Sequence, residues 1–138
     1  MSPNRRILLA DDDPLDVELF LLAMESLHLA GQVDVVNDGE AVLEHLARHP
    51  GAGAADTLAL VVLDVQMPKL GGLDVLKRIR ANPGLKALPV VVLTSSTEEP
   101  DLRESLALGV DEYIVKPMGL TGYLEAVARL GAQWLMGA

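Results

Sequence analysis

Hydrophobic runs alternate along the chain with segments of helical period. Short apolar runs that stop at polar or turn residues predict five strands, at 7–10, 33–36, 58–63, 89–93 and 113–115. Apolar residues three and four positions apart predict helices from Pro14 to about Leu29, around 42–47, around 73–79, at 98–108 and from 120 to the C-terminus. This alternation is typical of a parallel sheet covered by crossover helices.

Two of the predicted strands differ in how buried they should be. The run 58–63 is uninterrupted and stops abruptly at Asp64, which predicts a central strand covered on both faces. The run 33–36 is short and contains Asp34, so we expect it near an edge of the sheet. Asp13 before Pro14 is a typical N-cap and first position for the first helix.

Composition limits the classes of protein to consider. The 138 residues are one domain's worth of chain, so we expect a single domain at 1–138 with no attached output domain. Half of the residues are hydrophobic, which favours a folded globular protein over a disordered one. The formal net charge of -9 repels a phosphate backbone and argues against a nucleic-acid partner.

Cysteine usage and the absence of long apolar runs bear on the compartment. The chain has no cysteine, which permits a reducing compartment and excludes a thiolate zinc site. The first six residues form no apolar signal segment, and no run approaches the roughly 20 apolar residues of a membrane span. We therefore expect a cytoplasmic protein without a membrane partner.

Polar side chains directly follow four of the predicted strands. They are Asp11 and Asp12, Asp64, Thr94 and Ser95, and Lys116. Parallel strands bring their carboxyl ends to one edge of the sheet, in the crevice where open α/β sheets bind ligands. We therefore expect three carboxylates, two hydroxyls and one ammonium to meet there.

Such a cluster of acids requires a cation. At a separation of roughly 4 Å and an effective dielectric constant near 20, two carboxylates repel each other by about 4 kcal/mol, which raises at least one pKa. Lys116 neutralises one of the three charges, and oxygen-only ligands with open water positions favour Mg²⁺ for the rest. Mg²⁺, Lys116 and Thr94 suit a phosphoryl ligand, and an Asp beside it can become an aspartyl phosphate.

These residues resemble those of a known family, the receiver domains of two-component response regulators, from about Arg6 to the end of the chain. The motifs that carry the resemblance are Asp11-Asp12, Leu63-Asp64, Met67-Pro68, Gly71-Gly72, Thr94-Ser95, Tyr113 and Lys116-Pro117. The resemblance implies a flavodoxin-like, doubly wound (βα)5 sandwich. Its five-stranded parallel sheet would have the order 2-1-3-4-5, with helices on both faces.

The resemblance also implies roles for the site residues. Asp64 would be the phosphoacceptor, and Asp12 and Asp64 would bind Mg²⁺ together with the backbone carbonyl of Gln66. Asp11 would hold metal-bound water, and Lys116 would bond a phosphoryl oxygen. The peptide bond between Lys116 and Pro117 is expected to be cis. Thr94 and Tyr113 would be the switch pair, in which the hydroxyl moves to the phosphoryl group and the ring turns inward.

A finer resemblance concerns the partner. Three motifs resemble those of the single-domain regulators that partner phytochrome-type histidine kinases. They are Asp12-Asp13-Pro14 with Asp16 after it, Leu93-Thr94-Ser95-Ser96, and Gln133-Trp134-Leu135. The implied partner is a sensor histidine kinase of the bacterial phytochrome kind, and the implied activity is self-catalysed phosphoryl transfer and autodephosphorylation rather than turnover of a substrate. The face made by the helix at 98–108, the strand at 113–115 and the apolar last helix allows a two-fold homodimer.

Other functions fit parts of the pattern. A flavin-binding electron carrier would have this size and fold, but three aspartates in the first loop would repel a flavin phosphate. A phosphohydrolase with an Asp nucleophile usually has an acid two positions later, where this chain has Gln66. A phosphate sink and a pseudo-receiver that only binds proteins remain as alternatives. His45 and His49 have zinc-compatible spacing without a third ligand, so a solvated helix face is favoured.

Overall fold

The protein folds around one parallel sheet. The computed structural model describes residues 5–48 and 58–136. The strands are β1 (Arg6–Ala10), β2 (Val33–Val36), β3 (Leu58–Leu63), β4 (Val90–Thr94) and β5 (Glu112–Val115). Their order is β2-β1-β3-β4-β5, and each neighbouring pair is parallel. The doubly wound 2-1-3-4-5 prediction is therefore confirmed, with the fully buried β3 at the centre and β2 at an edge.

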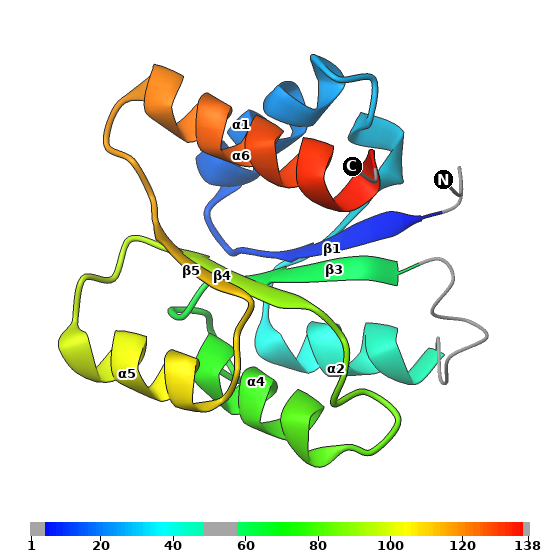
Figure 1. Ribbon diagram of the computed structural model, residues 1–138, viewed down its shortest axis with the longest axis vertical. Coiled ribbons are helices and arrows are strands. Elements are labelled where there is room, and N and C mark those ends of the chain that lie inside the picture. Colours follow the sequence, from blue (N-terminus) through cyan, green and yellow to red (C-terminus); the bar gives the residue numbers. More distant parts are fainter. Residues whose placement is uncertain (1–4, 49–57, 137–138) are drawn as a thin grey trace.

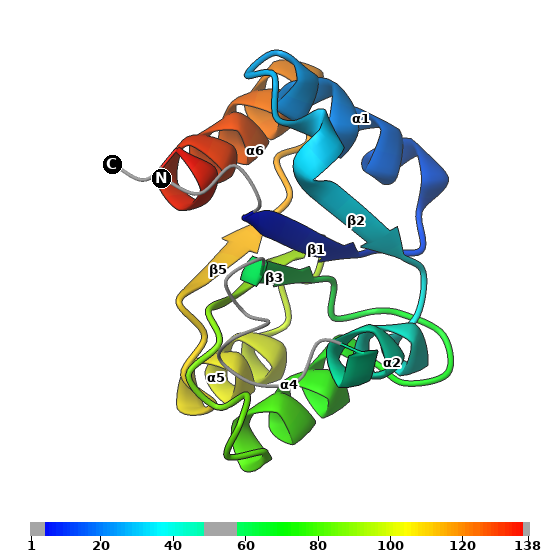
Figure 2. The same cartoon turned by 90° about the vertical axis from the view of Figure 1, so that its right-hand side faces the viewer.

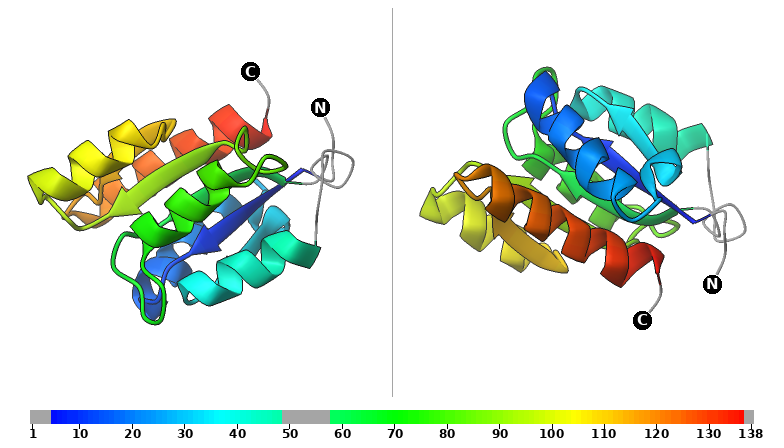
Figure 3. Two further views of the ribbon diagram at one scale, coloured as in Figure 1. Left: turned by 90° about the horizontal axis from the view of Figure 1, so that it is seen from below. Right: turned by 90° about the horizontal axis from the view of Figure 1, so that it is seen from above.

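Helices cover both faces of this sheet (Figure 1 and Figure 2). They are α1 (Pro14–Glu25), α2 (Gly39–Arg48), α4 (Gly72–Ala81), α5 (Glu99–Ala107) and α6 (Leu120–Leu135), with a short 3-10 turn at Ala30–Gln32. Helices α1 and α6 lie side by side on one face, and α2, α4 and α5 lie on the other (Figure 3). No helix in the described ranges combines the length and hydrophobicity needed to cross a membrane.

The alternation of side chains along the strands divides the core in two. In β1, Ile7 and Leu9 pack towards α1 and α6, whereas Leu8 and Ala10 pack towards α2 and α4. Leu60 and Leu63 of β3 divide in the same way between the two layers. Because a strand side chain changes face at every residue, the continuous apolar runs fill both layers at once and hold the strand ends rigidly.

Helix α1 ends four residues before the predicted position. We expected it to continue to about Leu29, but it ends at Glu25, and His28 adopts a left-handed conformation with φ of 61°. The turn is closed by the N–H of Leu29, which donates to the carbonyl of Met24 at 2.9 Å, and Leu29 then enters the core. A non-glycine residue makes the left-handed turn, so no glycine marks where the helix ends.

Arg80, near the end of α4, ties several segments together at the amino end of the sheet. Its guanidinium donates to four backbone carbonyls, those of Leu108 (2.9 Å), Gly109 (2.9 Å), Lys86 (3.1 Å) and Leu88 (2.8 Å). It also lies 3.9 Å from Asp111, whose carboxylate accepts from the N–H of Val90 at 2.8 Å. One side chain therefore joins the end of α5 to the turn that leads into β4.

Candidate functional site

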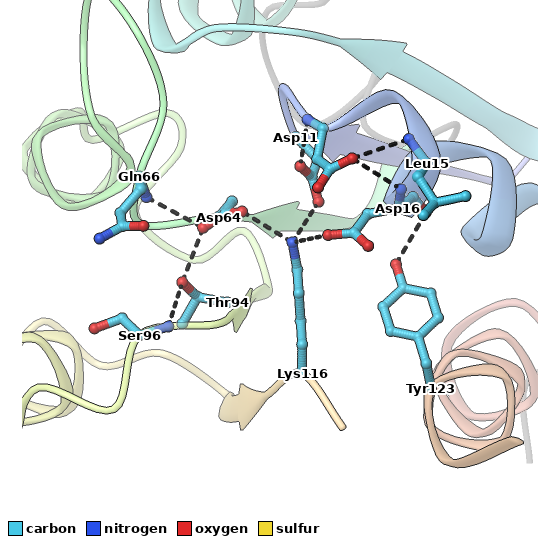
Figure 4. Close-up of polar contacts among 10 residues, drawn as sticks. Asp11, Leu15, Asp16, Asp64, Gln66, Thr94, Ser96, Lys116 and Tyr123 are labelled. Carbon is cyan, nitrogen blue, oxygen red and sulfur yellow. Dashed lines mark hydrogen bonds and ion pairs between the residues drawn. The ribbon is translucent and has the colours of Figure 1, made fainter. Parts of the chain in front are cut away.

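The carboxyl edge of the sheet brings the predicted residues together. Asp11 follows β1, Asp64 follows β3, Thr94 closes β4 and Lys116 follows β5 (Figure 4). The N–H of Asp64 donates to the carbonyl of Ala10 at 3.1 Å, so the ladder between β1 and β3 continues into the site. The topology therefore places four polar side chains from four strands in one cluster, as predicted.

The Lys116 ammonium lies at the centre of the cluster. Its Nζ is 2.9 Å from Asp11 Oδ2, 3.0 Å from Asp64 Oδ2 and 2.7 Å from Asp16 Oδ2. Burial disfavours the charged ammonium, but the hydrogen bonds to Asp16 and Asp11 and the charge of Asp64 outweigh it and raise the pKa of Lys116. The lysine therefore remains a cation and carries its charge next to Asp64.

The second oxygen of Asp64 is also held. Its Oδ1 accepts from Thr94 Oγ1 at 2.8 Å and from the N–H of Gln66 at 3.1 Å. Thr94 is fully buried and Asp64 is only 6% exposed, so these bonds exist largely away from water. Both oxygens of the carboxylate thus face donors that can stabilise negative charge.

Three carboxylates could hold a divalent cation. One oxygen each from Asp11, Asp12 and Asp64 lies within 4.8 Å of the others. Burial raises the pKa of Asp11, while hydrogen bonds from Lys116 and the N–H of Asp13 act against that rise. The donor set is oxygen-only and crowded with negative charge, so the residues present fit a hard divalent ion. The pKa direction matches the prediction, although burial is a larger cause than repulsion between the acids.

A second set of hydrogen bonds extends from Thr94. The N–H of Ser96 donates to Thr94 Oγ1 at 3.2 Å, and the hydroxyl of Tyr113 donates to the carbonyl of Ser96 at 3.1 Å. The buried Ser96 hydroxyl donates to Asp101 of α5 at 2.6 Å. The two predicted switch residues are therefore connected through Ser96, to which the sequence pattern alone assigns no role.

The loop after β3 approaches Asp64 closely. Gly72 begins α4, and a Cβ at this position would lie 2.1 Å from the carbonyl oxygen of Asp64. The N–H of Gly72 also donates to the carbonyl of Val65 at 3.0 Å. Only glycine allows this contact, which explains why the predicted motif needs glycine at position 72.

Some site features differ from the prediction. The Lys116–Pro117 bond was expected to be cis, but every peptide bond in the described part of the chain is trans. The trans form is favoured by about 0.5–1 kcal/mol for an X–Pro bond, and Lys116 reaches all three acids from it.

His45 is part-buried, its side chain being 16% exposed and 4.0 Å from Asp34, so the solvated-face interpretation was wrong for it. His49 lies outside the described residues.

Asp16 and Tyr123 were not predicted as parts of the site. Asp16 stands in the first turn of α1, and its backbone carbonyl accepts from the Tyr123 hydroxyl at 3.0 Å. Burial is the main cause that raises the pKa of Tyr123, so the hydroxyl stays a donor. The usable signal was the helix period: Asp13 is confirmed as the N-cap, and the residue three positions later turns back towards the same strand ends.

Comparison with known proteins agrees with this geometry. Residues 7–128 match the family model of the response regulator receiver domain. The chain therefore belongs to the receiver domains of two-component response regulators, a family of signalling proteins. This membership decides against the flavin-binding carrier. It also implies a histidine kinase as partner.

Several relatives match over nearly the whole chain. The probable methanogenesis regulatory protein FilR2 of Methanothrix harundinacea (strain 6Ac) is 36% identical over 94% of this chain and 83% of its own length. Response regulator Rcp1 of Synechocystis sp. is 31% identical over 97% of this chain and 91% of its own length, and its Mn(2+)-bound structure aligns with a TM-score of 0.81. The structure of the phosphorylated cyanobacterial phytochrome response regulator RcpA has 32% identity, 97% and 96% coverage of the two chains and a TM-score of 0.86. The chain is thus homologous to single-domain phytochrome response regulators.

Proposed function

We propose that this receiver accepts a phosphoryl group on Asp64 from a phosphohistidine of a sensor histidine kinase, with Mg²⁺ as the cation. The observation that carries the proposal is the environment of Asp64, whose two oxygens face the Lys116 ammonium on one side and the Thr94 hydroxyl on the other. The phosphorylated form of RcpA and the Mn(2+)-bound form of Rcp1 support the same chemistry for this chain.

The transfer needs a nucleophile and donors for the arriving oxygens. One carboxylate oxygen of Asp64 forms a bond to phosphorus while the bond from phosphorus to the imidazole nitrogen breaks, and that nitrogen keeps the electron pair. Lys116 and Thr94 then donate to oxygens of the transferred group, where charge accumulates. No general base is required, because a carboxylate nucleophile has no proton to lose when it attacks.

The cation would be held by the acids that flank Asp64. Asp12 and Asp64 would bind it directly with the backbone carbonyl of Gln66, and Asp11 would bind through water. When bound, Mg²⁺ neutralises the carboxylates and the charge of the phosphoryl group. The carboxylates of Asp11, Asp12 and Asp64 already lie close enough to share one ion, which supports these assignments.

We propose that phosphorylation is transmitted through Thr94, Ser96 and Tyr113 to α5 and β5. Thr94 Oγ1 contacts both Asp64 and the N–H of Ser96, so movement of this hydroxyl disturbs the Ser96 bonds to Tyr113 and Asp101. The phosphoryl group carries nearly two negative charges where the Asp64 carboxylate carried one, and this change provides the driving force. A homodimer through the face of α5, β5 and α6 stays a prediction, as does the single-domain organisation.

The rim of the site suggests where the kinase docks. A groove of about 460 Å³ beside Lys116 is lined by Leu15, Met118, Leu120 and neighbouring residues. Met118 is fully exposed, and Leu15 and Leu120 are 60% and 57% exposed. A protein that brings phosphohistidine to Asp64 must cover this rim, and buried apolar anchors carry much of the affinity of an interface.

The substitution Met118→Glu is therefore expected to slow transfer from a histidine kinase that labels the chain by about tenfold or more, because it introduces a charge into the buried contact. Labelling by acetyl phosphate, which needs no docking surface, should be unchanged. The rates are compared on phosphate-affinity gels, with Leu106→Glu on the exposed face of α5 as the control. Equal slowing with both donors would contradict the assignment of the rim to docking.

The proposed function is tested by mapping the label. The protein is incubated with acetyl phosphate with and without Mg²⁺, and borohydride then reduces any acyl phosphate to homoserine, which mass spectrometry locates. We expect homoserine at position 64 only, and only with the metal. Label elsewhere would contradict the assignment of Asp64. A lack of label with the metal would favour the pseudo-receiver alternative.

A further inference from the structure

Asp16 is a fourth acid in the site and belongs to none of the roles assigned so far. Its Oδ2 makes the shortest of the three contacts to Lys116, at 2.7 Å, and it comes from α1 rather than from a strand end (Figure 4). It is not part of the carboxylate group that could share a metal ion. Asp16 therefore needs an explanation of its own.

The number of N–H donors on Lys116 limits what this lysine can do. An ammonium has three donors, and Asp11, Asp16 and Asp64 use all three. To bond an oxygen of a phosphoryl group, Lys116 must release an acid. The Asp16 carboxylate is 22% exposed, against 2% for Asp11 and 8% for Asp64, so water can replace the lysine at Asp16 at the lowest cost.

We infer that Asp16 is a positioning residue that holds the Lys116 ammonium in the resting protein and releases it when a phosphoryl group reaches Asp64. This inference rests on the proposed function. Asp16 and the phosphoryl group then compete for the same donor. The charge of Asp16 also repels the anionic molecule that supplies the phosphoryl group. Both effects oppose phosphorylation.

The backbone of Asp16 is fixed independently of its side chain. Its carbonyl accepts from Tyr123, and its N–H contacts Asp13 Oδ1 at 3.4 Å. Neither bond uses the carboxylate, so Asp16→Asn should keep the first turn of α1 and its contact with α6. The substitution removes the charge but keeps an oxygen acceptor in a side chain of similar shape.

The first measurement is the rate of labelling by acetyl phosphate at subsaturating concentration with Mg²⁺. Asp16→Asn should label about tenfold faster than the wild type, the lower end of the effect of a hydrogen bond to a charged group. Glu18→Gln, the same charge change at an exposed position of α1, is the matched control. Asp16→Glu, which keeps the charge, should restore slow labelling. A rise of less than threefold beyond the control, or equally fast labelling of Asp16→Glu, would overturn the inference.

The second measurement needs neither metal nor phosphoryl donor. An amine-specific reagent is applied, and mass spectrometry compares modification of Lys116, whose side chain is 9% exposed, with that of the exposed Lys86. Because one of its three partners loses its charge, Lys116 should react at least threefold faster in Asp16→Asn than in the wild type. An unchanged ratio would overturn the holding role of Asp16.

The outcomes separate this inference from the proposed function. If the wild type is not labelled at Asp64, the proposed function fails, whereas the amine measurement still reports on the contact between Asp16 and Lys116. If the wild type is labelled at Asp64 and Asp16→Asn behaves like Glu18→Gln, only the role of Asp16 fails.

Discussion

Asp64→Asn is expected to reduce Mg²⁺-dependent labelling by acetyl phosphate about 1,000-fold or more, because the amide oxygen is too weak a nucleophile to attack phosphorus. The donors around it remain, since Thr94 Oγ1 and the N–H of Gln66 can still bond the Asn oxygen. The loss would therefore report the chemistry of the carboxylate. Initial rates of incorporation give the measurement, and Asp74→Asn, an exposed acid in the first turn of α4, is the control.

The same variant should keep the fold. Asp11 and Asp64 are both buried beside Asp16, with Lys116 as their shared cation, so removing one charge relieves repulsion. The free energy of unfolding in urea should stay the same or rise. Labelling that persists in Asp64→Asn would refute the acceptor assignment, and an unfolded variant would show that the carboxylate has a structural role.

Arg80→Met is expected to lower the free energy of unfolding by about 3 kcal/mol. The substitution keeps the apolar stem but removes all four donors to backbone carbonyls and the charge beside Asp111. Hydrogen bonds from charged groups contribute about 1.5–3 kcal/mol each, and water can replace some of them because the Arg80 side chain is 18% exposed.

Urea unfolding followed by circular dichroism measures this loss. Arg78→Met is the matched control, because Arg78 lies on the same helix and is exposed. We expect the control to differ from the wild type by no more than about 0.5 kcal/mol. A similar loss in both variants would mean that the helix responds to charge alone, and not to the carbonyl contacts of Arg80.

The sequence predicted the features that depend on local pattern and topology. The uninterrupted run at 58–63 identified the central strand, and parallel connections then fixed where Asp11, Asp64 and Lys116 must meet. The carboxyl ends of parallel strands share one edge whatever the details of packing. For this reason the cluster could be predicted without knowing any side-chain conformation.

What the sequence could not predict depends on contacts between distant side chains. The role of Arg80 requires the ends of α4 and α5 to meet, and the four carbonyls it contacts leave no signal in the residue types around them. The early end of α1 depends on a left-handed His28, which is uncommon for a residue with a Cβ. The helix period places Asp16 on the side of α1 that faces the strand ends, but its contact with Lys116 depends on how α1 packs over that lysine, which is a tertiary property.

Arg80 and the acid cluster lie at opposite ends of the same strands. Asp111 and Val90 stand where β5 and β4 begin, whereas Thr94 and Lys116 stand where these strands end. The backbone contacts of Arg80 and the acid cluster are thus separated by the length of the sheet. Substitutions that alter the stability contributed around Arg80 can therefore be selected separately from substitutions that adapt the acid cluster to a new partner.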